Sequence, residues 1–148
     1  MTFTRHIRTI CILAVIAVCA FAPAQSLAQS PELEAAFKEY QKLNKQGKYA
    51  EAVRFAKNFV ELAKREFGTE HRYVAVGLNN LAVLYQDQGR YAEAEPLYKR
   101  ALAIDEKTLG PEHPSTAITL SNLAHLYKAQ GQYAEAEPLY KRTLAIRE

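Results

Sequence analysis

The sequence predicts an all-α fold, a solenoid of three antiparallel helix pairs, and two observations support this prediction. The first is an internal repeat, since residues 89–106 (GRYAEAEPLYKRALAIDE) return 42 residues later as residues 131–148 (GQYAEAEPLYKRTLAIRE), with 15 of 18 positions identical. Self-similarity at one fixed period is typical of stacked repeat architectures. The second is that the chain beyond residue 30 carries helix signals and no run of strict apolar and polar alternation.

Residues 1–28 are predicted to be a secretory signal peptide. Arg5 and Arg8 precede an unbroken apolar run of 13 residues, 10–22, and small residues follow it. Such a run is too short to span a bilayer comfortably. We expect cleavage after Ala28, with Ala24 as the second choice and an uncleaved membrane anchor as the alternative. Export of a chain without disulfides predicts a location in a bacterial periplasm.

Removal of this leader changes the charge and the cysteine count. Cys11 and Cys19 both lie in it, so the mature chain would have no disulfide and no thiolate site. Val18 stands where a lipidation signal before Cys19 needs a small residue, which argues against a lipid anchor. The mature chain keeps 17 basic and 16 acidic residues, a net charge of +1. We therefore expect no nucleic-acid partner and no stable membrane span after cleavage.

The remaining domain, 29–148, is expected to contain three repeats at about 31–66, 70–108 and 114–148. Ser30 is a helix cap and Pro31 the first helical residue. Gly68 and Gly110 stand where a helix end uses a left-handed residue. Short turns at Gly47, Gly89 and Gly131 divide each repeat into two helices. The expected helices are 31–46 with 48–66, 70–88 with 91–108, and 114–130 with 133–148.

Apolar residues recur at helical spacing within each pair, which predicts the buried faces. In the second pair Leu78, Leu81 and Tyr85 form one stripe. Small residues that allow close helix approach recur at Ala82, Ala94, Ala124 and Ala136. We assign to the core the tyrosines Tyr85, Tyr91, Tyr98, Tyr127, Tyr133 and Tyr140. Pro96 and Pro138 lie inside the second helices and predict a bend in each.

The spacing Leu-x-x-Leu-Ala-x-x-Tyr-x-x-x-Gly-x-Tyr-x-x-Ala-x-x-x-Tyr-x-x-Ala over residues 78–101 resembles the tetratricopeptide repeat. Residues 120–143 match it except for Thr143 at the end. The first copy departs further, with Ala36 and Tyr40 in place of the leucine and alanine. The repeat is longer than the usual unit of about 34 residues, and in this extended form it is similar to the repeats of kinesin light chain.

This resemblance implies that the first helix of each pair lines a concave groove, where an asparagine holds the backbone of an extended peptide. The matching positions are Asn80 and Asn122, while Lys38 interrupts the series in the first pair. An amide can both donate to and accept from a peptide group. The other predicted groove residues are Val76, Asn79, Val83, Gln86, Asp87, Ile118, Ser121, His125 and Lys128. The alternative is that both asparagines bond neighbouring helices and only support the stack.

The histidines and charged pairs have structural explanations. His71 and His113 recur at the repeat period, which favours a role at helix starts over metal or base chemistry. His125 is the one histidine expected in the groove, and a single imidazole is a poor metal site. Lys99–Arg100 and Lys141–Arg142 are expected to face solvent. Because no phosphate loop or nucleophile motif is present, we expect no enzyme activity, no metal and no cofactor.

The sequence therefore predicts a non-enzymatic scaffold for protein–protein interaction, which binds a peptide or a partner helix in its groove. Two alternatives remain open. One is a self-assembling structural unit, in which two copies pair through Leu139, Leu144 and Ile146 on an uncapped last helix. The other is an accessory subunit of a periplasmic or envelope complex.

Overall fold

The computed structural model describes residues 30–148, which form six α-helices and no strand. The predicted signal peptide and its cleavage sites lie outside these residues. The helices are α1 (Pro31–Lys45), α2 (Tyr49–Phe67), α3 (Arg72–Asp87), α4 (Tyr91–Thr108), α5 (Pro114–Ala129) and α6 (Tyr133–Arg147). Each observed end lies within two residues of the predicted one. The predicted all-α fold of helical hairpins is thus confirmed.

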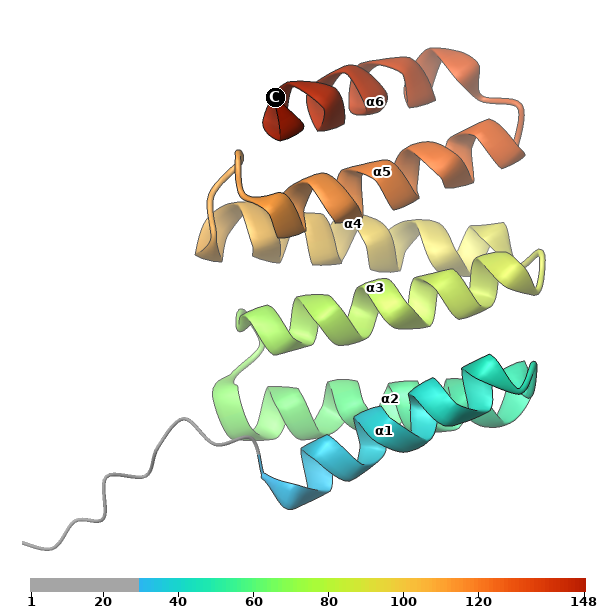
Figure 1. The fold of residues 1–148 in the computed structure, drawn as a ribbon, viewed down its shortest axis with the longest axis vertical. Coiled ribbons are helices and arrows are strands. Elements are labelled where there is room, and N and C mark those ends of the chain that lie inside the picture. The colour runs from blue at the N-terminus through green and yellow to red at the C-terminus, as the bar shows by residue number, and fades with distance from the viewer. Residues whose placement is uncertain (1–29) are drawn as a thin grey trace, which may run out of the picture.

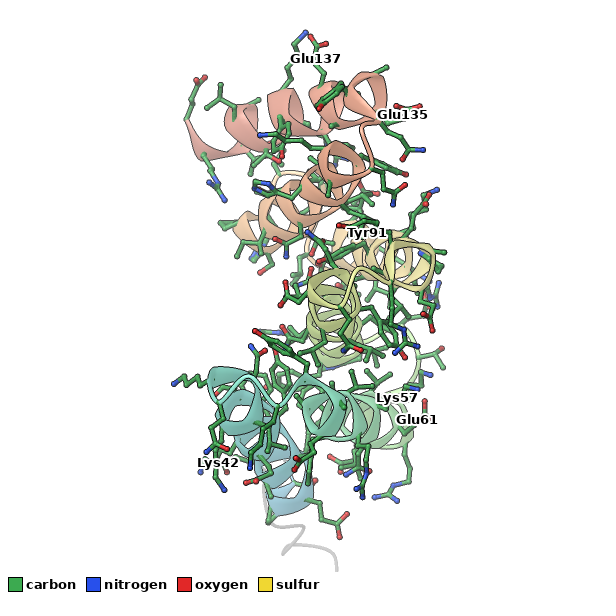
Figure 2. The ribbon with its side chains drawn as sticks, turned by 90° about the vertical axis from the view of Figure 1, so that its right-hand side faces the viewer. Lys42, Lys57, Glu61, Tyr91, Glu135 and Glu137 are labelled. Atoms are coloured by element: carbon green, nitrogen blue, oxygen red, sulfur yellow. The ribbon has the colours of Figure 1, made fainter. Side chains whose placement is uncertain are left out.

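The helices stack in chain order, each packed against the one before it (Figure 1). Helix α3 also contacts α5 directly. Figure 2 shows Lys42 of α1 on one side of the stack and Lys57 and Glu61 of α2 on the other. The contact between α3 and α5 shows that the first helices of the second and third pairs share one side of the stack, which we call the inner side.

Side chains that precede the helices fix where they start. The Ser30 hydroxyl accepts a hydrogen bond from the backbone N–H of Leu33 at 3.1 Å, as an N-cap does. His71 and His113 do the same with a ring nitrogen, each accepting from the backbone N–H two residues on, at 3.3 and 3.1 Å. The recurrence of these histidines at the repeat period is thereby explained. Gly68 and Gly110 have φ values of 88° and 100°, which confirms the expected positive φ at both positions.

The core follows the predicted stripes. Ala82, Ala94 and Ala124 are fully buried, and one apolar cluster runs from Tyr40 on α1 to Leu126 on α5. The assignment of every repeated tyrosine to the core is wrong for Tyr133, which is 67% exposed. Tyr140 is only half-buried. Helix α4 packs against both α3 and α5, whereas α6 packs only against α5 among the described helices, and both rings are more exposed than their counterparts Tyr91 and Tyr98.

The two junctions between pairs are built from different side chains. Between α2 and α3, Gly77 lies directly against Phe59 and Val60. Forty-two residues on, Thr119 takes the place of the glycine, and the smaller Ala101 takes the place of Phe59. At the first junction the ring of Phe59 therefore fits because Gly77 has no side chain. The second junction has space for the polar group of Thr119.

Surface ion pairs agree with the predicted solvent-facing sides. Glu95–Lys99 and Glu137–Lys141 form ion pairs one helical turn apart, at 2.7 and 2.5 Å. Arg100 pairs with Glu70 in the loop before α3, which ties α4 to that loop. Pro96 lies inside α4, which continues unbroken around it. The bend expected at the prolines stays a prediction.

Candidate functional site

The inner side carries a cleft of about 120 Å³ between the first halves of α3 and α5. Helix α3 contributes Arg72, Ala75, Val76, Asn79 and Asn80, and α5 contributes Ser115, Ile118 and Thr119. The end of α4 closes the cleft with Asp105 and Leu109. Val76 is 37% and Ile118 51% exposed, so large apolar side chains flank the cleft on both helices.

Four of the predicted groove residues line this cleft, namely Val76, Asn79, Asn80 and Ile118. Asn122 lies next to them, because its amide nitrogen donates to the side-chain oxygen of Asn79 at 3.0 Å. This bond joins α5 to α3 across the inner side. Part of the stack-supporting alternative is therefore observed, although the partner of Asn122 is a side chain and not a helix backbone. The Asn80 side chain makes no hydrogen bond within residues 30–148.

The other predicted residues lie outside the cleft. Val83 is partly buried against the apolar cluster that runs from Tyr40 to Leu126. Gln86 accepts a hydrogen bond from the hydroxyl of Tyr98 at 3.0 Å. Asp87, Ser121 and Lys128 do not line the cleft. Partial burial raises the pKa of the Asp87 carboxyl above its ordinary value.

His125 contacts α6 and not the cleft. Its Nδ1 lies 3.0 Å from the hydroxyl of Tyr140, and the two rings meet edge to face at 5.4 Å. His125 is the counterpart of Val83, which is partly buried against the apolar cluster in the second pair. His125 was expected in the groove. The contact with Tyr140 could not be foreseen, because the repeat pattern does not show which neighbouring helix a side chain meets.

Sequence reasoning missed one residue of the cleft in particular, Asp105. Its side chain is only 4% exposed, and its Oδ2 accepts a hydrogen bond from Thr119 at 2.9 Å. Burial raises the pKa of the Asp105 carboxyl, against smaller opposing effects of the Thr119 bond and of the charges of His113 and Arg72. The sequence did hold a signal, since an aspartate lies next to Ile104 on the buried stripe of α4.

Within residues 30–148, no group of three or more potential ligand side chains could hold a metal ion. Nor does that part of the chain contain a helix long and apolar enough to cross a membrane. The cleft itself is small. It offers amide groups, an apolar rim and one buried carboxylate, that of Asp105.

The model of the Tetratricopeptide repeat family matches residues 43–107 and 73–148. The chain belongs to the tetratricopeptide repeat family. The first match begins near the end of α1, in keeping with the departures of the first copy from the pattern. Repeats of this family generally mediate protein–protein interaction, and such scaffolds are typically non-catalytic. A comparison with curated protein sequences finds no match.

Solved structures with the same fold include kinesin-light-chain-like repeat proteins. BtubC (BKLC) from P. vanneervenii superposes with a TM-score of 0.73 at 23% identity, over 78% of this chain and 45% of that one. A P. anserina protein described as a kinesin light chain with nearly identical TPR-like repeats gives 0.71 at 30% identity, over 81% and 57%. The TPR domain of Arabidopsis FLU gives 0.68 at 20%, over 80% and 96%. The chain spans about half the length of the first two structures.

Proposed function

We propose that the protein is an exported scaffold that holds an extended peptide segment of a partner protein along the inner side of α3 and α5. The observation that carries this proposal is the cleft, with Asn79 and Asn80 in its wall and Asn122 beside it. The Asn80 amide offers a donor and an acceptor to a peptide group of any sequence. Val76 and Ile118 add exposed apolar surface for the side chains of the peptide.

The bond between Asn79 and Asn122 supports this arrangement. It uses one of the two donor hydrogens of Asn122 and one of the two lone pairs on the Asn79 oxygen, which leaves further donors and acceptors on both amides. The bond also orients the two side chains before a ligand arrives. A preformed site of this kind loses little side-chain entropy on binding, so most of the ordering cost falls on the peptide.

A peptide library tests the proposal. The purified protein is expected to retain a set of extended peptides, whose affinities are then measured by fluorescence polarisation. Asn80→Ala and Asn122→Ala should each weaken binding by about 2- to 10-fold, the range for one hydrogen bond. Lys57→Ala and Glu61→Ala, on the opposite side of the stack (Figure 2), are matched controls and should bind as the wild type does. Failure to retain any peptide, or equal affinity of the double asparagine variant, would contradict the proposal.

Export is the second part of the proposal, supported by Arg5, Arg8 and the apolar run that follows them. The mass of the protein purified from its native host should correspond to a chain that starts at Gln29, or at Gln25 for the second cleavage site. A full-length chain in the membrane fraction would contradict export with cleavage. In the periplasm, peptide capture would suit an accessory subunit of an envelope complex, which a pull-down from that compartment would identify.

Self-association is a second candidate function, favoured by the outer face of α6. Tyr133 is 67% and Leu144 60% exposed there, whereas their counterparts Tyr91 and Leu102 pack against the core. Two copies that pair through this face would bury it. Sedimentation at high micromolar concentration should then show a dimer that Leu144→Ser disrupts. A strict monomer would rule out this function and leave peptide capture untouched.

A further inference from the structure

A buried carboxylate without a counter-ion lies at the floor of the cleft. None of the ion pairs within residues 30–148 includes Asp105. The charges of Arg72 on α3 and of His113 before α5 act on it, but neither group forms an ion pair or a hydrogen bond with it. The Arg72 guanidinium lies over the ring of Tyr73, 5.5 Å from its centre. Removing a charge from water without pairing it is unfavourable, so Asp105 is costly for the free protein.

Packing of the repeats does not require this carboxylate. The equivalent positions in the junction between α2 and α3 are Ala63, which is fully buried, and Gly77. That junction is built without any polar side chain at these two places. The Asp105–Thr119 pair is therefore particular to the junction that forms the cleft. An ionisable group that lies buried in a cleft, and whose pKa is shifted because it has lost contact with water, is a candidate for ligand recognition.

The size and lining of the cleft restrict what can reach Asp105. Its volume of about 120 Å³ is well below the roughly 300–1,000 Å³ of small-molecule sites, so it has room for a single side chain. Exposed apolar groups of Val76 and Ile118 flank the opening. A ligand side chain with an apolar stem and a cationic end matches both the rim and the floor.

The space in the cleft distinguishes between the two common cationic side chains. Thr119 donates to Oδ2 of Asp105, which leaves Oδ1 as the oxygen without a partner in residues 30–148. A guanidinium fork binds a carboxylate best through both oxygens at once. An ammonium is a compact charge that needs only one. Thr119 takes one acceptor position on Oδ2 and leaves the other free, so the preference comes from space: a cleft of about 120 Å³ suits the compact ammonium of lysine better than the wider guanidinium of arginine.

We propose that the cleft between α3 and α5 binds a lysine side chain of the partner, with its ammonium group against Asp105 and its methylene stem between Val76 and Ile118. This inference rests on the proposed function, because the lysine would belong to the captured peptide. The positive charge of Arg72, which lines the same cleft, opposes any cation there, including this lysine, and therefore limits the expected affinity.

The test is an NMR titration of the purified, isotope-labelled protein with N-acetyl-lysine methylamide, a lysine blocked at both ends. Saturable shifts are expected for the amides of Val76, Ile118 and Thr119, with a dissociation constant on the order of 1–10 mM. Blocked norleucine has almost the same stem without the charge and should bind about 10-fold more weakly, with blocked arginine in between. Asp105→Asn, which keeps an oxygen for Thr119, should lose the preference for lysine. Equal binding of norleucine, an unchanged preference in Asp105→Asn, or no shift at these residues would overturn the inference.

A measurement on the wild type keeps the test independent of how the variant folds. The pKa of the Asp105 carboxyl, followed by its side-chain carbon resonance, should fall when blocked lysine saturates the cleft, because the ammonium favours the ionised form. Blocked norleucine should leave the pKa of Asp105 unchanged. If blocked lysine does not lower this pKa, the inference is overturned. Capture of peptides without a lysine preference contradicts only the lysine site. Binding of blocked lysine without capture of any peptide contradicts only the proposed function.

Discussion

Gly77→Ala tests how tightly the second helix pair is fitted to the first. A Cβ at this position would lie 2.7 Å from Cγ2 of Val60 and 2.8 Å from Cδ1 of Phe59. Both distances are shorter than real Cβ contacts. Val60 and Phe59 are 3% and 5% exposed, so neither can move aside into solvent. The added methyl group must displace α3, α2 or the buried ring.

Two opposing contributions set the expected size of the effect. Extra methyl groups in a well-packed core typically cost about 1–3 kcal/mol. Alanine gains about 1 kcal/mol over glycine inside a helix. We therefore expect Gly77→Ala to lower the free energy of unfolding by about 1 kcal/mol, measured by urea denaturation with circular dichroism. Ala103→Gly on the exposed side of α4 is the control for the backbone contribution and should cost about 1 kcal/mol by itself.

A double-variant cycle isolates the steric contribution. Val60→Ala removes the methyl group that the new Cβ would meet, so Gly77→Ala should be tolerated better in that background, by about 1 kcal/mol. A gain of about 1 kcal/mol for Gly77→Ala alone would refute the reasoning, because it would mean that the helix propensity of alanine acts without a steric cost. The contact between α2 and α3 would then be looser than the structure shows.

Three further predictions concern helix starts and the core. Ser30→Ala removes the cap of α1 and should lower the free energy of unfolding by about 1 kcal/mol in urea denaturation; an unchanged value would mean that the cap is not formed. Tyr98→Phe removes the hydroxyl that donates to Gln86 and should cost about 1 kcal/mol, with Tyr133→Phe on the exposed surface as a neutral control. Burial, assisted by the charge of Arg72, lowers the pKa of His71 below the ordinary 6.5, so the unfolded chain binds the proton more readily. Stability is therefore expected to fall as the pH drops through about 6.5 towards the folded-state pKa, and His71→Asn, an alternative cap, should remove that part of the pH dependence in denaturation curves measured on both sides of 6.5. Identical pH dependence in wild type and variant would contradict the assignment to His71.

The fold could be predicted from the sequence because its signals are local and occur more than once. Gly89 and Gly131 lie in turns that need a positive φ, and the structure gives them 72° and 75°. Ser30 and Pro31 place the first helix start without any knowledge of its neighbours. The exposed ring of Tyr133 was not predictable from the pattern, because the nine residues that follow it are the same as those that follow Tyr91.

The candidate site was only partly predictable because it depends on contacts between pairs. The position of Asn80 and Ile118 on the inner side was expected from the resemblance to kinesin light chain repeats, and both line the cleft. The bond between Asn122 and Asn79 requires knowledge of how far α5 is shifted along α3. Asp105 reaches the cleft from α4, a helix whose role in the pattern is to form the core. Comparison of the copies at buried positions, where Asp105 replaces Ala63, would have pointed to it.

Site-specific photo-cross-linking in the native host tests the central claim, that partners bind at the cleft between α3 and α5. A photoreactive residue in place of Ile118, which is 51% exposed beside the cleft, should trap a partner protein. The same residue in place of Glu61, on the opposite side of the stack (Figure 2), should not. The cross-link from position 118 should weaken in the Asn80→Ala background. Equal trapping from both positions, or trapping from position 61 alone, would contradict the account.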